Sequence, residues 1–457
     1  MSVTTRNPAT GEDLQTYELH TDAEAAQIVE AAGDAFQQWR RVPIAERADV
    51  VRRLGQVLRD HEQELAELMT AEMGKPVAQG SPEVQLCAAI CDWTADHGPE
   101  ILADQRQPLE GGHAVITHQP IGVVYGIQPW NFPMYQVIRF SISQLVAGNT
   151  VLLKHAESVW GTALRLEELY HEAGIPTDAF KVLLIDHDQS DDVIAMPQVR
   201  GVTLTGSDGA GKAVAATAAQ HLKKAVVELG SNDSYLVLSD ADIELAVSTS
   251  VQGRITNNGQ TCVAAKRFVV VDEVYDAFRD AYVEAMGAVE MGDPTQESCD
   301  LGPMSREQLR DELHEQVVAS IEKGAKAAVG GQKPDRAGAW YPATVLENVE
   351  PGQPAYDDEL FGPVAALIRA RDDDDAKRIA NDSRYGLGGG IFSRDVEAAT
   401  QWALTEFDTG MVNVNGYNLA QPHLPFGGVK DSGFGREHGE PGMKEFVNIK
   451  SVMVADA

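Results

Sequence analysis

The sequence predicts an α/β protein of two or three folding units that contains a mostly parallel sheet. At 457 residues the chain is too long for a single core. Short apolar runs such as "IGVVYGI", "FKVLLI" and "YLVL" alternate with longer helical segments, which is the pattern of βα units. Hydrophobic residues make up 43% and charged residues 23% of the chain, an ordinary globular composition.

The helices and strands follow in order from their periodicity and punctuation. Apolar residues recur at three- and four-residue intervals from Ala45 to Met73, with Gly74 and Pro76 as a stop, and predict one long amphipathic helix. "HAVITHQP" alternates like an exposed strand. The βα units then run from "IGVVYGI" to "YLVL". A second α/β stretch, 231–427, contains the strands "KRFVVV" and "GPVAALI" and a helix that opens near "SREQLRDEL". "RDDDDAKRIAND" is expected to cap and open a solvated helix.

The charge of the chain excludes several partners. Its 69 acidic and 37 basic residues give a formal charge of −32, which argues against nucleic acid and anionic membranes. The acidic residues are spread along the chain, as on the solvated surface of a salt-adapted protein, although an ordinary acidic protein is the alternative. No apolar run approaches the roughly 20 residues that span a bilayer. The opening "MSVTTRNPATGEDL" lacks the features of a secretory signal, so a cytoplasmic location is expected.

Four cysteines are too few for a disulfide framework in a chain of this length. Cys87 and Cys91 are spaced to lie on one helix face, where core packing is favoured over a shared metal because no further ligand pair stands at a suitable spacing. Four roles are open at this point for Cys262, in "TNNGQTCVAAKRF": a buried space-filler, a metal ligand, half of a disulfide or a nucleophile.

Polar and small residues follow the predicted strands. They are Trp130 and Asn131, Lys154 and Glu157, Thr205 with Gly206 and Ser207, and Glu228. Because ligands bind beyond the carboxyl ends of strands in an open parallel sheet, we expect these residues at one edge that forms the site.

Two chemistries are compatible with these residues. Gly206, Gly209 and Gly211 stand between a strand and a helix, where backbone N–H groups can bind a pyrophosphate, although a plain turn is the alternative. Lys154 with Glu157 suits ribose hydroxyls, with a surface ion pair as the alternative.

A cysteine, an amide and a carboxylate form a complete set for acyl transfer. Cys262 would attack a carbonyl, Asn131 would stabilise the oxyanion, and Glu228 would activate water. A helix dipole or a nearby lysine is expected to lower the pKa of the Cys262 thiol from about 8.5.

Seven stretches resemble, in order, the signatures of the NAD(P)-dependent aldehyde dehydrogenase superfamily. They cover nearly the whole chain and are "PWNFP" at 129–133, "LLKHAE" at 152–157, "TLTGSDGAG" at 203–211, "VELGSND" at 227–233, "GQTCVAAKRF" at 259–268, "ELFGPV" at 359–364 and "PFGGVKDSGFGRE" at 425–437.

The resemblance implies a fold and a division of the chain. A Rossmann-type coenzyme domain would comprise 1–102 and 119–230, and an α/β catalytic domain 231–427. A small β element, 103–118 and 428–457, would build a dimer or tetramer from the hairpin "QRQPLEGGHAVITHQP" and the strand "FVNIKSVMV".

The resemblance also implies the roles of single residues. Cys262 would be the nucleophile, Glu228 the base for thioester hydrolysis, and Asn131 with the Cys262 backbone N–H the oxyanion hole. A CoA-acylating relative would generally lack the carboxylate of Glu228. The coenzyme site would comprise Trp130, Lys154, Glu157, Gly206, Ser207, Gly211, Leu229, Glu359 and Phe361, with no metal.

Three features bear on activity and specificity. Ser231 stands where many members have glycine. Its larger side chain could alter how Glu228 moves, so the alternative is a relative that binds coenzyme but lacks activity. Arg139 matches the position at which succinate-semialdehyde dehydrogenases carry an arginine that meets the substrate carboxylate, with a structural arginine as the alternative, while Thr256 replaces another arginine of some relatives. Glu157 would repel a 2′-phosphate, so NAD is expected, with NADP also open.

Overall fold

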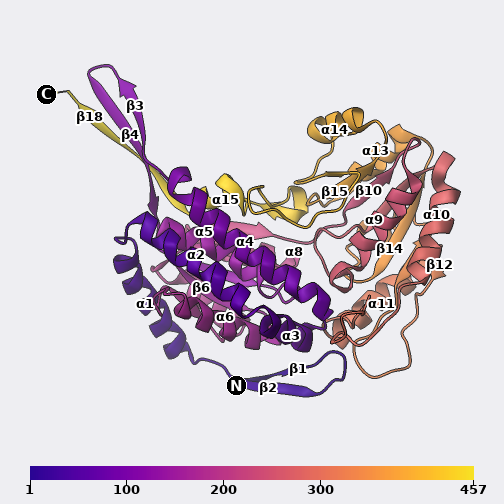
Figure 1. Ribbon diagram of the computed structural model, residues 1–457, viewed down its shortest axis with the longest axis horizontal. Coiled ribbons are helices and arrows are strands. Elements are labelled where there is room, and N and C mark those ends of the chain that lie inside the picture. The colour runs from indigo at the N-terminus through magenta and orange to yellow at the C-terminus, as the bar shows by residue number, and fades with distance from the viewer. Residues whose placement is uncertain (457) are drawn as a thin grey trace.

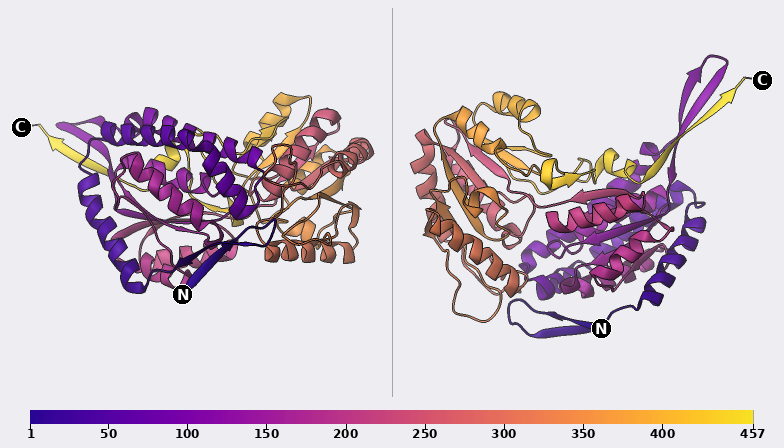
Figure 2. Two further views of the ribbon diagram at one scale, coloured as in Figure 1. Left: turned by 60° about the horizontal axis from the view of Figure 1, so that its bottom comes forward. Right: turned by 180° about the vertical axis from the view of Figure 1, so that it is seen from behind.

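The computed structural model describes residues 1–456 and contains two large sheets, a three-stranded sheet and a two-stranded N-terminal hairpin (Figure 1). We call the six-stranded sheet with helices α1 to α8 the first lobe, and the seven-stranded sheet with helices α9 to α14 the second lobe. The two lobes lie side by side, and the three-stranded sheet projects away from the first lobe (Figure 2).

The sheet of the first lobe has the order β17-β9-β8-β5-β6-β7. Its parallel strands are β5 (Val123–Gln128), β6 (Thr150–His155), β7 (Phe180–Val182), β8 (Val199–Thr205) and β9 (Lys224–Glu228), and β17 (Gly433–Phe434) pairs antiparallel with β9. The register pairs Gln128 with His155 and Thr205 with Glu228. Neighbouring strands therefore end level, and the residues that follow them share one edge of the sheet.

Helices cover both faces of this sheet, which explains why its strands are continuous apolar runs. They are α1 (Asp22–Trp39), α2 (Ile44–Asp60), α3 (Glu62–Met73), α4 (Val77–Ile101), α5 (Tyr135–Ala147), the 3-10 turn η1 (Glu157–Val159), α6 (Trp160–Glu172), α7 (His187–Ala195) and α8 (Asp208–Gln220). Every residue of α5 is buried, because α2, α4 and the strands β5 and β6 all pack against it.

The predicted single helix from Ala45 to Met73 is wrong at one residue. The backbone of His61, with φ −109° and ψ 16°, separates α2 from α3. Leu58 and Leu65, on either side of the break, are both fully buried. Apolar periodicity therefore continues across the break and cannot reveal it.

The sheet of the second lobe has the order β12-β13-β14-β11-β10-β15-β16 and is parallel apart from β12. Its strands are β10 (Ser234–Val237), β11 (Arg267–Val271), β12 (Lys326–Val329), β13 (Thr344–Glu347), β14 (Val364–Ala370), β15 (Gly389–Phe392) and β16 (Asn413–Val414). Its helices are α9 (Ile243–Ile255), the 3-10 turn η2 (Thr256–Gly259), α10 (Asp272–Gly287), α11 (Glu307–Glu322), α12 (Pro354–Asp357), α13 (Asp373–Asn381) and α14 (Val396–Thr405). The predicted acidic cap is confirmed, since the Asp372 carboxylate accepts the N–H of Asp375 at 2.8 Å at the start of α13.

The remaining elements are peripheral. The N-terminal hairpin consists of β1 (Ser2–Arg6) and β2 (Asp13–Glu18), and the 3-10 turn η3 (Lys430–Ser432) and α15 (Gly439–Lys444) lead into the C-terminal strand. The projecting sheet has the order β18-β4-β3, formed by β3 (Gln105–Leu109), β4 (Gly112–Pro120) and β18 (Val447–Ala455), all antiparallel. The predicted hairpin and C-terminal strand are therefore both present and pair with each other.

Cys87 and Cys91 lie on α4 and are fully buried in the hydrophobic core of the first lobe. Burial raises the pKa of both thiols above the ordinary value, as expected for inert core cysteines. None of the helices within residues 1–456 combines the length and the apolar character needed to cross a bilayer.

Candidate active site

The loop that carries Cys262 begins with three residues in the left-handed backbone conformation. Asn257, Asn258 and Gly259 have φ of 57°, 56° and 72°. Asparagine tolerates this region better than most residues. At Gly259 a Cβ atom would lie 2.4 Å from the carbonyl carbon of Gly362, so only glycine fits. Such a turn is costly and persists only when its surroundings hold it.

Hydrogen bonds to both lobes hold this turn. The Asn257 side-chain amide donates to the carbonyl oxygen of Asn131 at 2.6 Å. The Asn258 amide donates to the carbonyl oxygens of Gly74, in the first lobe, at 2.9 Å and of Pro303, in the second lobe, at 2.8 Å. The nucleophile candidate is thus fixed where the two lobes meet.

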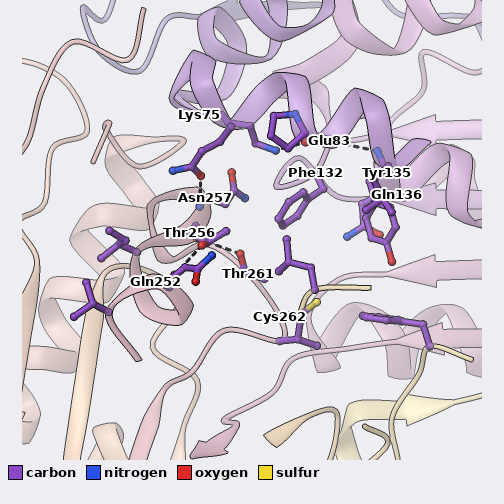
Figure 3. A pocket seen from close by; sticks show the side chains of 18 of the residues that line it. Lys75, Glu83, Phe132, Tyr135, Gln136, Gln252, Thr256, Asn257, Thr261 and Cys262 are labelled. Atoms are coloured by element: carbon purple, nitrogen blue, oxygen red, sulfur yellow. Dashed lines mark hydrogen bonds and ion pairs between the residues drawn. The ribbon is translucent and has the colours of Figure 1, made fainter. Parts of the chain in front are cut away.

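Cys262 lines a pocket of about 530 Å³ between α4, α5 and α9. In Figure 3 its sulfur lies below the rings of Phe132 and Tyr135, with Lys75 on the opposite side of the view. The other lining residues are Gln79, Pro82, Glu83, Leu86, Gln136, Ser248, Val251, Gln252, Ile255, Thr256, Asn257, Thr261, Val263, Leu419 and Phe426. Lys75 is paired with Glu83, so the pocket offers mainly apolar contacts, amides and hydroxyls.

Asn131 lies against the loop of Cys262. It follows β5 and is 4% exposed. Its side-chain N–H donates to the carbonyl oxygen of Gln260 at 3.1 Å, just before Cys262 in the chain. The structure therefore brings together the amide and the thiol that sequence analysis placed in one site.

Glu228 ends β9 inside a buried charge cluster. Arg139 Nη2 lies 2.9 Å from Glu228 Oε2, and Arg139 also forms an ion pair with Glu437. Arg139 Nη2 donates to Thr205 Oγ1 at 2.7 Å. Burial raises the pKa of Glu228 to about 7; Arg139 opposes this shift and Glu437 adds to it. A carboxyl group with a pKa near neutrality suits a general base.

This cluster corrects the expectation that Arg139 meets a substrate carboxylate. The side chain of Arg139 is fully buried between two carboxylates of the protein. Its guanidinium carbon lies 5.2 Å from the ring centre of Tyr135 and 4.8 Å from that of Phe426, and both rings line the pocket. Arg139 thus forms a second layer behind the pocket wall, which favours the structural alternative.

The expected lowering of the Cys262 thiol pKa is also wrong. Burial, reinforced by the charge of Glu228, raises that pKa to about 12, although Arg139 and Lys266 oppose the shift. The expected lysine is present, but desolvation outweighs it. A base must therefore remove the thiol proton before Cys262 can attack, and Glu228 is the carboxylate whose charge acts most strongly on the thiol.

Ser231 is turned away from this chemistry. Its hydroxyl donates to the Asp233 carboxylate, which also accepts the N–H of Gly388 at 3.0 Å. Ser231 and Asp233 are both buried. The residue that departs from the usual glycine is therefore engaged with the second lobe and not with Glu228.

Most of the predicted coenzyme residues lie at the shared edge of the first sheet. Lys154 is the penultimate residue of β6 and is buried, which lowers its pKa, while the neighbouring Glu157 opposes that effect. Ser207 caps α8 by accepting the N–H of Ala210 at 3.3 Å.

Gly206 precedes α8 and Gly211 lies in its first turn. A Cβ at Gly211 would lie 2.3 Å from the Leu229 side chain, so this glycine allows α8 to pack closely against the end of β9. A Cβ at Gly206 would meet only the Leu204 side chain, at 3.6 Å, which is an ordinary contact distance. The close packing of the turn therefore depends on Gly211 and not on Gly206.

His155 lies beside Lys154 and carries no charge at neutral pH. Burial lowers its pKa to about 4, and its ring nitrogens lie 3.1 Å and 2.8 Å from the carbonyl oxygens of Gln128 and Pro133. Glu157 therefore has no cationic neighbour at position 155.

Glu359 and Phe361 come from the segment between α12 and β14. The ring of Phe361 meets the edge of Trp130 at 5.8 Å between ring centres. Glu359 Oε1 lies 2.9 Å from Lys266 Nζ. Each of these residues therefore contacts a residue from another of the seven signature stretches.

Sequence reasoning missed Glu437 and Lys266. Lys266 had a signal, because a lysine within "CVAAKRF" interrupts an apolar run that enters the buried strand β11. No sequence signal indicated Glu437, because its partner Arg139 lies on a helix far away in the sequence.

Comparisons with known proteins agree with this geometry. Residues 1–452 match the family described as "Aldehyde dehydrogenase family". The chain is similar to a succinate-semialdehyde dehydrogenase [NADP(+)] of Deinococcus radiodurans, with 45% identity over 98% of this chain and 94% of the relative. It is also similar to a succinate semialdehyde dehydrogenase [NAD(P)+] of Escherichia coli, with 44% identity over 98% of this chain and 96% of the relative.

A solved structure shares the whole fold. The succinic semialdehyde dehydrogenase of Streptococcus pyogenes in complex with NADP+ has a TM-score of 0.96 and 36% identity, and the match covers 99% of both chains.

Proposed function

The chain belongs to the aldehyde dehydrogenase family, and on that premise we propose that it oxidises succinate semialdehyde to succinate with NAD as the preferred coenzyme. The observation that supports the reaction is the position of Cys262, which lines the pocket while Asn131 contacts its loop and the charge of the buried carboxyl Glu228 acts on its thiol. The substrate is supported by the relatives, which are named as succinate-semialdehyde dehydrogenases.

The edge of the first sheet fits a dinucleotide. Lys154 and Glu157 supply the ammonium and carboxylate that suit ribose hydroxyls. Ser207 and the first N–H groups of α8 suit the pyrophosphate, because a helix N-terminus favours anions. Glu359 and Phe361 would hold the nicotinamide end. When bound, the coenzyme takes up the hydride that leaves the aldehyde carbon.

Glu157 supports NAD over NADP. A carboxylate beside the adenosine ribose accepts hydrogen bonds from its hydroxyls but repels a 2′-phosphate. His155 is neutral and offers no compensating charge. Although the relatives above are named for NADP(+) or NAD(P)+, we expect this chain to favour NAD.

The residues of the site divide the reaction into two halves. Glu228 takes the proton of the Cys262 thiol, and the thiolate attacks the aldehyde carbon. The carbonyl oxygen, which gains the negative charge, accepts hydrogen bonds from the side-chain N–H of Asn131 and the backbone N–H of Cys262. Loss of hydride leaves a thioester on Cys262. Glu228 passes the thiol proton to solvent and then accepts a proton from water as that water attacks the thioester. The Cys262 sulfur leaves as a thiolate and takes this proton back from Glu228, and the acid is released.

The pocket suits a short acidic aldehyde. With Arg139 behind the wall and Lys75 balanced by Glu83, the substrate carboxylate would be met by neutral donors. Gln79 uses its side-chain oxygen to accept the N–H of Asn257 at 2.7 Å, which leaves its amide N–H groups as donors. Gln252 and Ser248 line the same pocket from α9.

We also propose that the chain assembles as a homo-oligomer through the projecting sheet. Strand β18 is paired on one side, with β4, and stands at the edge of its sheet. Its side chains Ile449, Val452, Met453 and Val454 are all exposed, at 59%, 43%, 75% and 42%. An unpaired apolar edge strand is the type of surface that pairs with another chain.

The test is the formation of reduced coenzyme by purified protein at low and high salt. The panel comprises succinate semialdehyde, propanal, glyceraldehyde and betaine aldehyde, each with NAD and NADP. We expect the highest kcat/KM for succinate semialdehyde with NAD. Turnover of an uncharged aldehyde alone would contradict the substrate assignment, and coenzyme binding without any turnover would contradict the reaction.

A further inference from the structure

Lys266 is a buried lysine that joins two parts of the site. It lies just before β11, and its side chain is 1% exposed. Its ammonium pairs with the Glu359 carboxylate at 2.9 Å and donates to the backbone carbonyl oxygen of Cys262. A single side chain thus links the loop of the nucleophile to the carboxylate that we propose to hold the nicotinamide end of the coenzyme.

We propose that Lys266 is a positioning residue that neutralises Glu359 beside Cys262 and thereby keeps the thiol able to ionise. The inference rests on the proposed function, because it takes Cys262 as the nucleophile. It assigns Lys266 a role in the reactivity of the thiol before any aldehyde binds.

The charges around Cys262 explain why Lys266 matters. Glu228 and Glu359 oppose ionisation of the thiol, whereas Arg139 and Lys266 favour it, and the phenols of Tyr135 and Tyr417 face the same space. Arg139 already pairs with two carboxylates, Glu228 and Glu437. Lys266 is therefore the cation that balances Glu359.

Loss of Lys266 would leave Glu359 without its partner. A buried carboxylate deprived of its cation is strongly disfavoured, and its charge would act on the nearby thiol without compensation. Lys266 also opposes the effect of burial that raises the pKa of Asp233 to about 6, so the same cation serves the buried Asp233. The uncompensated charge of Glu359 makes the Cys262 thiolate harder to form.

The experiment measures the alkylation of Cys262 by iodoacetamide, without aldehyde, at several pH values below the raised pKa of its thiol, where the rate follows the fraction of thiolate. Peptide mass spectrometry identifies the modified cysteine, and Cys299→Ser in every protein removes the half-exposed thiol. We expect Lys266→Met to slow alkylation at pH about 8 by about tenfold, equal to one pKa unit, and to shift the profile to higher pH. Lys266→Arg should stay close to the parent.

Two further variants separate this role from a general loss of structure. Glu359→Gln should speed alkylation, and Lys266→Met with Glu359→Gln should return it toward the parent rate. Lys181→Met, which breaks the ion pair of Lys181 with Glu167 in the first lobe, is the matched control and should leave the profile unchanged.

Superimposable profiles of the parent and Lys266→Met would overturn the proposal. If Lys266→Met does not fold, slower alkylation of Glu359→Gln would overturn it instead. Because alkylation needs neither aldehyde nor coenzyme, the result is independent of whether the proposed oxidation is correct.

Discussion

Arg139→Met should change the pH dependence of catalysis and not the recognition of the substrate carboxylate. The substitution keeps an unbranched side chain of similar length but removes the cation between Glu228 and Glu437. Both carboxyl groups then face each other without compensation, so the pKa of Glu228 should rise above about 7.

The magnitude follows from the 2.9 Å separation of Arg139 Nη2 and Glu228 Oε2. At an effective dielectric of about 20, Coulomb's law gives about 6 kcal/mol, which is about four pKa units. Relaxation of the site reduces this upper limit, and an opposite charge at such distances typically moves a carboxyl pKa by about one to three units. Breaking a buried ion pair also costs about 3–5 kcal/mol of unfolding free energy.

The assay compares kcat/KM against pH for Arg139→Met and the parent, with succinate semialdehyde and with butanal. We expect the limb near pH 7 to move upward by at least about one unit, with both aldehydes affected by a similar factor. The matched control is Arg47→Met, because Arg47 is a buried arginine whose partners are backbone carbonyl oxygens. A rise in KM for succinate semialdehyde alone, with no shift in the pH dependence of kcat/KM, would refute this reasoning. It would show that Arg139 binds the substrate carboxylate.

Three further predictions address the coenzyme, stability and assembly. Glu157→Gln should lower the KM for NADP by about tenfold, or about 1.4 kcal/mol, while the KM for NAD changes little; initial rates decide, and an unaltered coenzyme preference would contradict the role of Glu157. Burial raises the pKa of Glu72 and Glu228 to about 7 and of Asp233 to about 6. These groups hold protons more tightly when folded, so they stabilise the protein at low pH, and that contribution is lost as the pH rises from about 4 to 7. Urea unfolding at pH about 5.5 and 7.5 should show lower stability at the higher pH, and a gain would count against these shifts. Ile449→Asp with Val452→Asp should yield a smaller particle by light scattering, whereas Val396→Asp, at an exposed position on α14, should not; an unchanged mass in the double variant would exclude β18 as the interface.

Much of the fold was predictable because it depends on local patterns. Apolar runs predicted β5 to β11 and β14. Lys154 and Glu228, at or near the ends of their strands, lie at one edge of a sheet as expected. The break at His61 was not predictable, because Leu58 and Leu65 keep the helical spacing across it.

The electrostatics of the site were less predictable, because they depend on long-range partners. The role of Arg139 is decided by Glu437, which joins it only through the folded C-terminal segment. The thiol pKa depends on burial and on four nearby charges, of which Glu228 and Glu359 reinforce burial while Arg139 and Lys266 oppose it, and sequence spacing carries no measure of burial. Ser231 looked like a threat to the base, but its hydroxyl faces Asp233, a residue two positions further along the chain.

The most direct test of the mechanism is the mass of the Glu228→Gln variant after mixing with succinate semialdehyde and NAD. Without Glu228 the Cys262 thiol loses its proton to solvent, so the thiolate forms slowly, although the removal of a charge that opposes its ionisation partly offsets this loss. The base that activates water for hydrolysis is absent, so the thioester should accumulate. Intact-protein mass spectrometry should therefore find one succinyl group per subunit, located on Cys262, and none when NAD is left out or when Cys262→Ser is also present. An unmodified Cys262 in a variant that still reduces NAD would contradict the covalent pathway.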